Sequence, residues 1–205
     1  KSLALPKVFL GLGVMSFTTD QVEAMQVIEN TVFRQILRAS SLTPNAVLRG
    51  EIGSSRMENR MIESRFLFVK SIWEGNNEMI KEVLRKVMDN TGNSWNKKMN
   101  QYLEKTDLTN ETLYEMSRTE LRNKVREIDK RFWINEMEQL KTLEIYRKYK
   151  TEIKEVRIYD NRISSKWLFR ARSNSLKVNQ RSYFLKRAIK RKIKFVDYVT
   201  KRRKA

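Results

Sequence analysis

The sequence predicts a mostly α-helical protein, and three observations support this prediction. The 205 residues include only 6 Gly and 2 Pro, far below average usage of roughly 7% and 5%, so there is little turn-forming chemistry. Leu, Met, Glu, Lys and Arg, which all favour helices, dominate the composition. Apolar residues also recur every three or four positions in several segments, which is the spacing of a buried helix face.

The first elements follow from composition and capping residues. Residues 3–17 are apolar, and we expect a short strand or another buried segment there. Thr18, Thr19 and Asp20 then offer an N-cap for a helix over residues 21–38. The positions of this helix that are spaced for burial are Val22, Met25, Ile28 or Glu29, Val32, Ile36 and Leu37.

The segment 43–73 is the centre of the predicted fold. It begins with a Pro-Asn turn, passes Gly50 and Gly53, and continues as an unbroken helical pattern. Two neighbouring apolar tracks predict one buried face, the first made of Met57, Met61, Phe68 and Ile72 and the second of Ile62, Phe66, Val69 and Trp73. Basic residues are interleaved with these tracks.

The remaining segments also favour helices. We expect helices over residues 78–88, after a cap at Ser94, and from a capping box at Ser117 and Glu120 through residue 140, with a further N-cap signature at Thr109. A shorter basic helix over 144–154 follows, then a helix over 166–172 capped by Ser164 or Ser165. Residues 185–199 form an amphipathic basic pattern. We find no repeat of fixed period.

The positive charge is concentrated at the C-terminal end. The chain carries 43 basic and 24 acidic residues, a net charge of +19. Residues 163–205 hold 15 basic residues against 1 acidic residue, which is fourteen of the nineteen excess charges. This asymmetry favours a polyanionic partner, nucleic acid first and an anionic membrane surface second. Residues 51–162 are nearly balanced, which is typical of a solvated helix surface.

Several classes of site are excluded by residues that the sequence lacks. There is no Cys and no His, so we expect no cofactor, no disulfide, no zinc site of the usual Cys/His kind and no Ser-His-Asp triad. Acidic pairs such as Glu136 and Glu138 occur without a polar pocket nearby, so we assign no catalytic residue. The composition fits an intracellular protein. Because the chain begins with Lys, we expect a fragment of a longer protein.

Arginines around the central segment are the first candidate binding residues. Arg56 and Arg60 are one helical turn apart, and Arg49 lies where glycines leave backbone N–H groups free to meet phosphate. In one interpretation all four arginines (Arg49, Arg56, Arg60 and Arg65) contact a nucleic-acid backbone without base readout. In the other, Glu51, Glu58 and Glu63 pair with them on a solvated face.

Tryptophans and the basic end offer further candidates. Trp73, Trp95 and Trp133 lie on or beside apolar tracks and are expected to pack in the core, whereas arginines surround Trp167. The basic candidates here are Arg170, Arg172, Lys186, Arg187, Lys190, Arg191 and Lys192. The tail is compatible with a nuclear localisation patch, a nucleic-acid-binding arm, a helix on anionic lipid or a disordered basic extension.

Longer phrases in the sequence resemble a known family. The phrases are LPKVFLGLGVMSFT, QVIENTVFRQILRASSLTPNAVLRGEIGSS, RMIESRFLFVKSI, LRNKVREIDKRFW, LEIYRKYKTEIKE and IYDNRISSKWLFRARSNSLKVNQR. Together they resemble the C-terminal portion of the reverse transcriptase of animal non-LTR (LINE-type) retrotransposons, over residues from about 3 to 181. The resemblance implies a helical thumb that follows the polymerase palm and continues into a helical linker.

The resemblance also sets limits. The chain has no YADD-type motif, no fingers and no Cys/His knuckle, and residues 183–205 do not look like the family. It therefore implies a piece without polymerase activity of its own, with the palm and fingers as missing partners. The expected organisation is a palm-proximal remnant (1–17), a thumb-like helical bundle (18–92), a helical linker (93–181) and a basic tail (182–205).

Two functions remain open from the sequence. One is a nucleic-acid-binding fragment of a reverse transcriptase that contacts the primer-template backbone. The alternative is a non-enzymatic helical interaction or scaffold protein with a basic tail.

Overall fold

The computed structural model describes residues 11–156 and 163–173, with only the backbone for 163–165. Within these ranges the chain is 73% helical and has no strand, so the predicted fold class is confirmed. The elements are α2 (Thr19–Leu37), α3 (Asn45–Ile52), α4 (Met57–Trp73), α5 (Glu78–Asp89), α6 (Ser94–Thr106), α7 (Asn110–Glu115), α8 (Arg118–Glu138), the 3-10 turn η1 (Lys141–Leu143), α9 (Glu144–Tyr149) and α10 (Ile163–Arg172).

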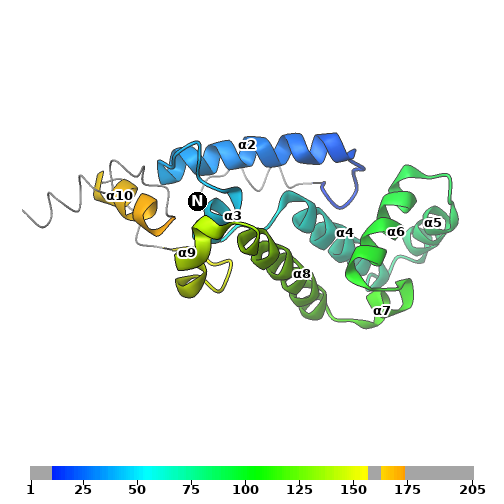
Figure 1. Cartoon of the computed structure of the whole chain (residues 1–205). Helices are drawn as coiled ribbons and strands as arrows, with labels where there is room; N and C mark the ends of the chain where they lie inside the picture. The colour runs from blue at the N-terminus through cyan, green and yellow to red at the C-terminus, as the bar shows by residue number, and fades with distance from the viewer. Residues whose placement is uncertain (1–10, 157–162, 174–205) are drawn as a thin grey trace, which may run out of the picture.

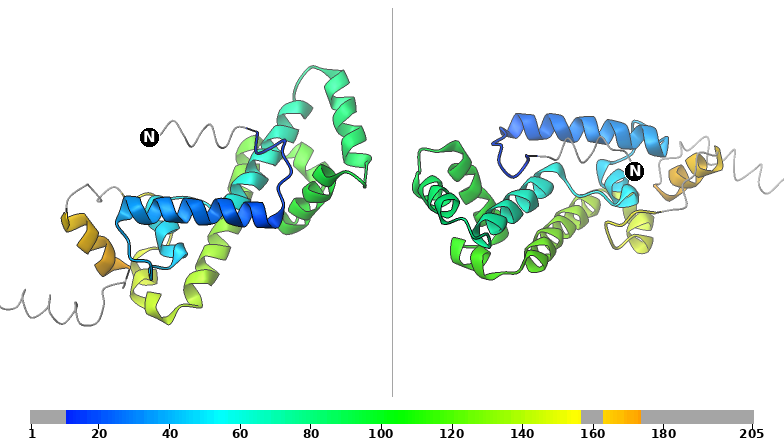
Figure 2. Two further views of the ribbon diagram at one scale, coloured as in Figure 1. Left: turned by 90° about the horizontal axis from the view of Figure 1, so that it is seen from above. Right: turned by 180° about the vertical axis from the view of Figure 1, so that it is seen from behind.

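The molecule is elongated and built around one pair of helices. α4 and α8 lie side by side, α2 runs along one edge above α3 and α4, and α5 to α7 form one end (Figure 1). α9 and α10 lie at the opposite end, near α3. The two further views show the same order from above and from behind (Figure 2).

Local capping explains where several helices begin. Thr18, Thr109 and Ser117 each accept a hydrogen bond from the backbone N–H three residues on, with a reciprocal bond back. The predicted caps at Thr109 and Ser117 are confirmed, and among the three candidates for α2 the cap is Thr18. The predicted cap at Ser94 is wrong. Asn93 caps α6 instead, because its side chain accepts from the Trp95 N–H at 2.8 Å.

The glycines after residue 43 have different roles from those expected. Gly50 lies inside a short helix, α3, where a Cβ atom would meet the Trp133 ring at 2.8 Å, so it permits close packing. Gly53 ends that helix with φ +75°, a conformation that suits glycine. Tertiary packing on Trp133 therefore adds a helix where the sequence predicted a turn.

Two hydrophobic clusters hold the helices together. The first is Leu12, Met57, Met61, Ile62, Phe66, Val69, Leu84, Trp95, Met99, Tyr102, Leu103, Leu113, Leu121 and Val125. The second is Phe33, Leu37, Ala46, Val47, Leu48, Trp133, Met137, Leu143, Tyr146 and Phe169. The start of α8 belongs to the first cluster and its end to the second, so α8 connects them. The first cluster contains residues from both sides of position 92, which is the expected boundary between the thumb-like bundle and the helical linker.

The face predicted for α4 is confirmed, while that predicted for α2 is partly wrong. Met57, Met61, Ile62, Phe66 and Val69 of α4 are buried. In α2, however, the buried side chains are Glu29, Asn30, Phe33 and Leu37. Val32 and Ile36, which were expected in the core, are 45% and 62% exposed. Of the two alternatives Ile28 or Glu29, the structure buries Glu29 and leaves Ile28 65% exposed. The face of α2 that packs against the core is therefore not its most apolar face.

The strand or buried segment expected over residues 3–17 lies only partly within the described residues. Residues 3–10 lie outside the described part of the chain, and residues 11–14 form a turn. Leu12 is buried in the first cluster, as expected for a buried segment. No strand is present in residues 11–17.

Candidate nucleic-acid interface

The structure places two of the candidate arginines in the interior. Arg49 on α3 is 3% exposed and forms an ion pair with Glu136 of α8. Burial lowers the pKa of its guanidinium from the usual range, and Glu136 partly opposes this effect. Arg49 therefore joins α3 to α8, and its charge is directed at a protein carboxylate rather than at solvent.

Arg65 on α4 has a similar structural role at the other cluster. It is 1% exposed, and its Nη2 donates to the Met15 carbonyl at 2.6 Å. The guanidinium lies 5.0 Å from the ring centroid of Trp95 and 5.3 Å from that of Tyr102, a cation–π arrangement. Burial lowers its pKa. An external phosphate has no access to such a side chain.

Arg56 and Arg60 lie near the surface but differ in their partners. Arg60 forms an ion pair with Glu29 of α2, and its Nε donates to the Ser55 carbonyl at 3.1 Å. Arg56 lies at the N-cap position of α4, and its guanidinium is 5.9 Å from the Phe132 ring. The carboxylates suggested by the sequence, Glu51, Glu58 and Glu63, pair with other cations: Arg172, Lys105 and Arg122.

Two backbone N–H groups at the start of α4, near the glycine-marked region, already have side-chain acceptors. The Arg56 N–H donates to Asp129 Oδ1 at 3.4 Å. The Met57 N–H donates to Gln26 Oε1 at 2.8 Å. Side chains from α8 and α2 therefore cap α4 in place of a local residue.

The C-terminal candidates divide into described and undescribed residues. Arg170 lies 5.5 Å from the Trp167 ring, and Arg172 forms an ion pair with buried Glu51 at 3.2 Å. The tail candidates Lys186, Arg187, Lys190, Arg191 and Lys192 lie outside the described residues. The structure thus assigns Arg172 a role in attaching α10 to α3.

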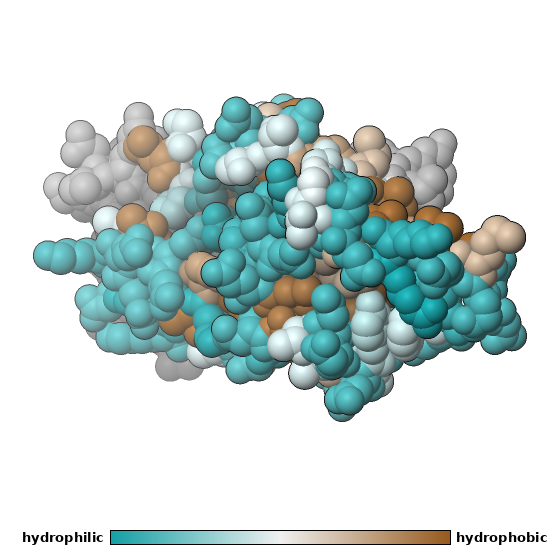
Figure 3. Space-filling model, turned by 90° about the vertical axis from the view of Figure 1, so that its right-hand side faces the viewer, coloured by the Kyte–Doolittle hydropathy of each residue, from teal (hydrophilic) through white to brown (hydrophobic). Residues whose placement is uncertain are grey.

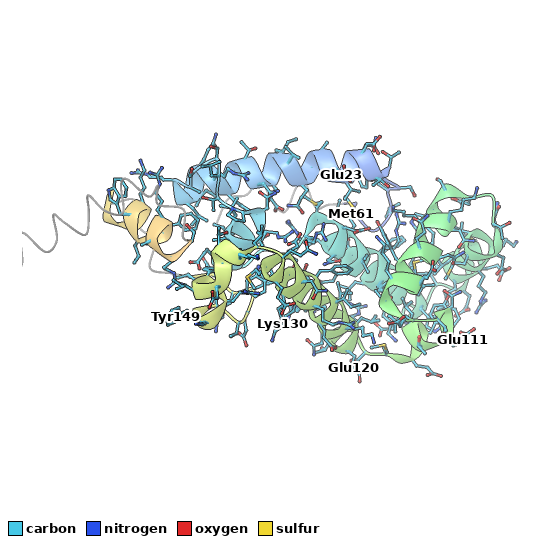
Figure 4. All side chains as sticks on the ribbon, in the orientation of Figure 1. Glu23, Met61, Glu111, Glu120, Lys130 and Tyr149 are labelled. Atoms are coloured by element: carbon cyan, nitrogen blue, oxygen red, sulfur yellow. The ribbon has the colours of Figure 1, made fainter. Side chains whose placement is uncertain are left out.

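An exposed basic row on α8 was not singled out by the sequence reasoning. Its members, spaced by four residues, are Arg118, Arg122, Arg126 and Lys130. This spacing places them along one side of the helix with a rise of about 6 Å per step. Figure 4 labels Lys130 on this helix. This spacing is visible in the sequence. It was not selected because the nearly balanced charge of residues 51–162 was interpreted as that of a solvated helix surface.

The two ends of the α8 basic row differ in their partners. Arg118 is paired with Glu74 at 2.8 Å and Arg122 with Glu63 at 3.4 Å, both at the exposed surface. The side chains of Arg126 and Lys130 are exposed and have no ion pair or hydrogen bond with any residue that the structure describes. These two cations are therefore available to an external anion.

An open cleft of about 550 Å³ lies beside Arg126 and Lys130. The turn at 53–55, Glu63, Glu152 and Ile153 also line it. Asp129 also lines the cleft: it is 2% exposed, its Oδ1 accepts from Asn59 at 2.6 Å, and its Oδ2 is buried without a hydrogen-bond partner. The cleft therefore has mixed charge, with the cations Arg60, Arg126 and Lys130 and the carboxylates Glu63, Asp129 and Glu152 in its lining.

Other classes of site find no support in the described part of the chain. No group of three or more acidic side chains there is arranged to hold a metal ion. None of the described helices has the length and apolarity needed to cross a membrane. At the α5–α7 end, the surface is largely hydrophilic with scattered hydrophobic patches (Figure 3).

The tryptophans mostly follow the core prediction. Trp133 is fully buried and donates to the Ala46 carbonyl at 2.7 Å, and Trp95 donates to the Gly13 carbonyl at 3.2 Å. Trp73 is partly buried and stacks on Tyr114 with ring centroids 4.1 Å apart. Trp167, the expected exception, is half-buried beside Arg170.

Comparison with known proteins identifies no family. No family model, curated protein or solved structure matches this chain.

Proposed function

We propose that this chain binds nucleic acid through the sugar-phosphate backbone, as the thumb and helical-linker portion of a LINE-type reverse transcriptase. The sequence resemblance motivates the parent enzyme, and the chain is proposed to have no polymerase activity of its own because it lacks a YADD-type motif. The palm and fingers of the parent are the proposed partners, and the nucleus is the proposed compartment. The α8 basic row carries the binding proposal.

Arg126 and Lys130 are the main proposed phosphate contacts. Both cations are exposed and have no ion-pair partner among the described residues, so a phosphate can bind them without breaking an existing ion pair. Arg118 and Arg122 extend the row, and their surface ion pairs are weak, typically worth about 0–1 kcal/mol. A step of about 6 Å along α8 lets successive cations of the row contact different phosphates of a strand.

The charge of the C-terminal segment supports the same function. Residues 163–205 carry 15 basic residues and 1 acidic residue, which favours long-range attraction of any polyanion. In this proposal the tail supplies bulk attraction and the α8 basic row sets the position of the backbone. Neither element reads base edges, so sequence preference is not expected.

The experiment measures binding of the full chain to a fluorescent primer-template duplex at several salt concentrations. Four phosphate contacts from the α8 basic row contribute a slope of about −3.6 in log K against log salt. The Arg126→Gln/Lys130→Gln variant is expected to weaken binding and reduce the slope by about two. Lys97→Gln/Lys148→Gln removes the same charge from exposed sites on α6 and α9 and serves as the control.

Equal effects of the two double variants would show that net charge alone drives binding and would contradict the role of the row. Affinity that does not change with salt would contradict the function itself. It would favour the alternative, a helical interaction or scaffold protein.

A further inference from the structure

The outward face of α2 carries an uncharged, largely apolar surface. Val27, Ile28, Val32 and Ile36 are 63%, 65%, 45% and 62% exposed. The exposed residues Gln21, Ala24, Thr31 and Gln35 lie among them. In a chain in which 33% of residues are charged, an exposed helix face without a charge from position 24 to position 36 is unusual and indicates a surface that becomes covered. We call this surface the α2 face.

No described element covers the α2 face. α2 contacts α3, α4 and α10 through its opposite side, where Glu29, Phe33 and Leu37 are buried. α2 forms the upper edge of the molecule in Figure 1 and again in the right-hand view of Figure 2, with no described helix above it.

The chemistry of the α2 face favours a protein helix as its occupant. The face has no cation, which excludes it as a phosphate or anionic-lipid surface. The Thr31 hydroxyl already donates to the Val27 carbonyl at 2.9 Å, so covering Thr31 leaves no unmet donor.

We propose that the occupant is a second copy of this chain, with the two α2 helices packed antiparallel about a two-fold axis at Ile28. Ala24 and Val32 are each four residues from Ile28, and Gln21 and Gln35 are each seven residues away. A two-fold axis at this point therefore sets Ile28 against Ile28 of the other copy. It also sets the small Ala24 against Val32 and Gln21 against Gln35, in an isologous interface.

Charges at the two ends of α2 are complementary in this arrangement. Asp20 and Arg38 are both exposed, and neither has an ion pair with a described residue. Asp20 lies in the first turn of α2 and Arg38 is its C-cap residue, so the two charges lie at opposite ends of the α2 face. Antiparallel packing brings Asp20 of each copy close to Arg38 of the other, whereas parallel packing brings like charges together.

The association is expected to be weak. One helix pair buries less than the roughly 800 Å² per partner of a stable interface, so we expect a dissociation constant on the order of tens of micromolar. The net charge of +19 opposes self-association. Added salt therefore strengthens the dimer by screening this repulsion, in contrast to nucleic-acid binding, which salt weakens.

Disulfide trapping tests the proposed register, because the natural chain has no cysteine. Ile28→Cys places the two thiols at the two-fold axis and should form a disulfide-linked dimer on mild oxidation. Ile36→Cys, on the same face, places them 16 residues apart along the helix pair, about 24 Å, and should not cross-link. Met79→Cys on α5, 78% exposed, measures random collision.

Sedimentation analysis of the full chain complements the trapping experiment. Ile28→Lys should weaken association at least tenfold, and Asp20→Arg or Arg38→Asp should each weaken it severalfold. The double variant Asp20→Arg/Arg38→Asp should recover much of the loss. A monomer at all concentrations up to several hundred micromolar, or Ile28→Cys and Ile36→Cys cross-linking equally, would overturn the proposal.

Discussion

Asp129 of α8 accepts a hydrogen bond from the side-chain amide of Asn59 of α4 at 2.6 Å, between two residues that are 2% and 5% exposed. The same carboxylate oxygen accepts from the Arg56 N–H and so helps to cap α4. This contact connects the two central helices through polar groups. It also explains why α4 needs no capping side chain of its own.

Loss of this contact is expected to destabilise the fold. Asp129→Ala leaves the Asn59 amide unsatisfied in the interior, which costs about 1–3 kcal/mol. Asp129→Asn keeps an acceptor oxygen and should cost less. Urea unfolding followed by circular dichroism measures both, with exposed Glu127→Ala as a control expected to stay within roughly 0.5 kcal/mol. A loss in the control as large as that of Asp129→Ala would contradict the role of the contact.

Gly50→Ala is expected to destabilise the protein although alanine is the better helix former. A Cβ atom at this position would lie 2.8 Å from both the Trp133 ring and the Tyr146 hydroxyl. Overpacking of this kind typically costs about 1–3 kcal/mol, which outweighs the gain in helix propensity of about 1 kcal/mol. Thermal unfolding checks this prediction. Gly92→Ala, whose added Cβ meets only a side-chain oxygen at 3.2 Å, provides the matched control.

Arg49 and Arg126 should separate stability from binding. Arg49→Gln removes a buried cation that is paired with Glu136, and it should lower the free energy of unfolding by roughly 1–3 kcal/mol. Its salt slope for duplex binding should match that of the natural chain at temperatures where both are folded. Arg126→Gln should behave in the opposite way, with unchanged stability and a slope reduced by about one. If Arg49→Gln reduced the salt slope, that result would show that Arg49 contacts the nucleic acid and would contradict its structural role.

The capping box of α8 should make stability depend on pH. The Ser117 N–H donates to Glu120 Oε2 at 2.6 Å, and this bond, with that to the Ser117 side chain, lowers the pKa of Glu120 from 4.5. Because the folded pKa is the lower one, the stabilisation is present above pH 4.5 and is lost as the pH falls through the folded pKa.

Glu120→Gln should therefore lower the melting temperature at pH 7 and lose its difference from the natural chain at acidic pH. The measurement is thermal unfolding between pH 7 and pH 3, with Glu127→Gln on the same helix as control. A difference that persists at pH 3 would show that the carboxylate charge is not the source.

Local signals account for what the sequence predicted well about the fold. The starts of α2, α7 and α8 follow from Thr18, Thr109 and Ser117, whose capping partners are three residues away. The buried face of α4 follows from its three-four spacing. The face of α2 was misjudged because Glu29 and Asn30 are buried beside partners such as Arg60, while Ile28 and Ile36 remain exposed.

The candidate site was predictable only in part. Basic composition and the tail charges suggested a polyanionic partner, but the availability of each arginine depends on hydrogen-bond acceptors far away in the sequence. Arg49 meets Glu136 after 87 positions, and Arg65 meets the Met15 carbonyl after 50. Conversely, the i, i+4 spacing of Arg126 and Lys130 was visible, but their lack of partners was not.

The sequence by itself determined the helical class, the positions of most helices and the strong positive charge of the C-terminal segment, because propensity, capping and composition act over a few residues. The tertiary structure decided which cations are buried, which are free, and which apolar face of α2 remains open. These outcomes depend on how α2, α3, α4 and α8 pack together, since burial and pairing are properties of neighbours that only folding brings into contact.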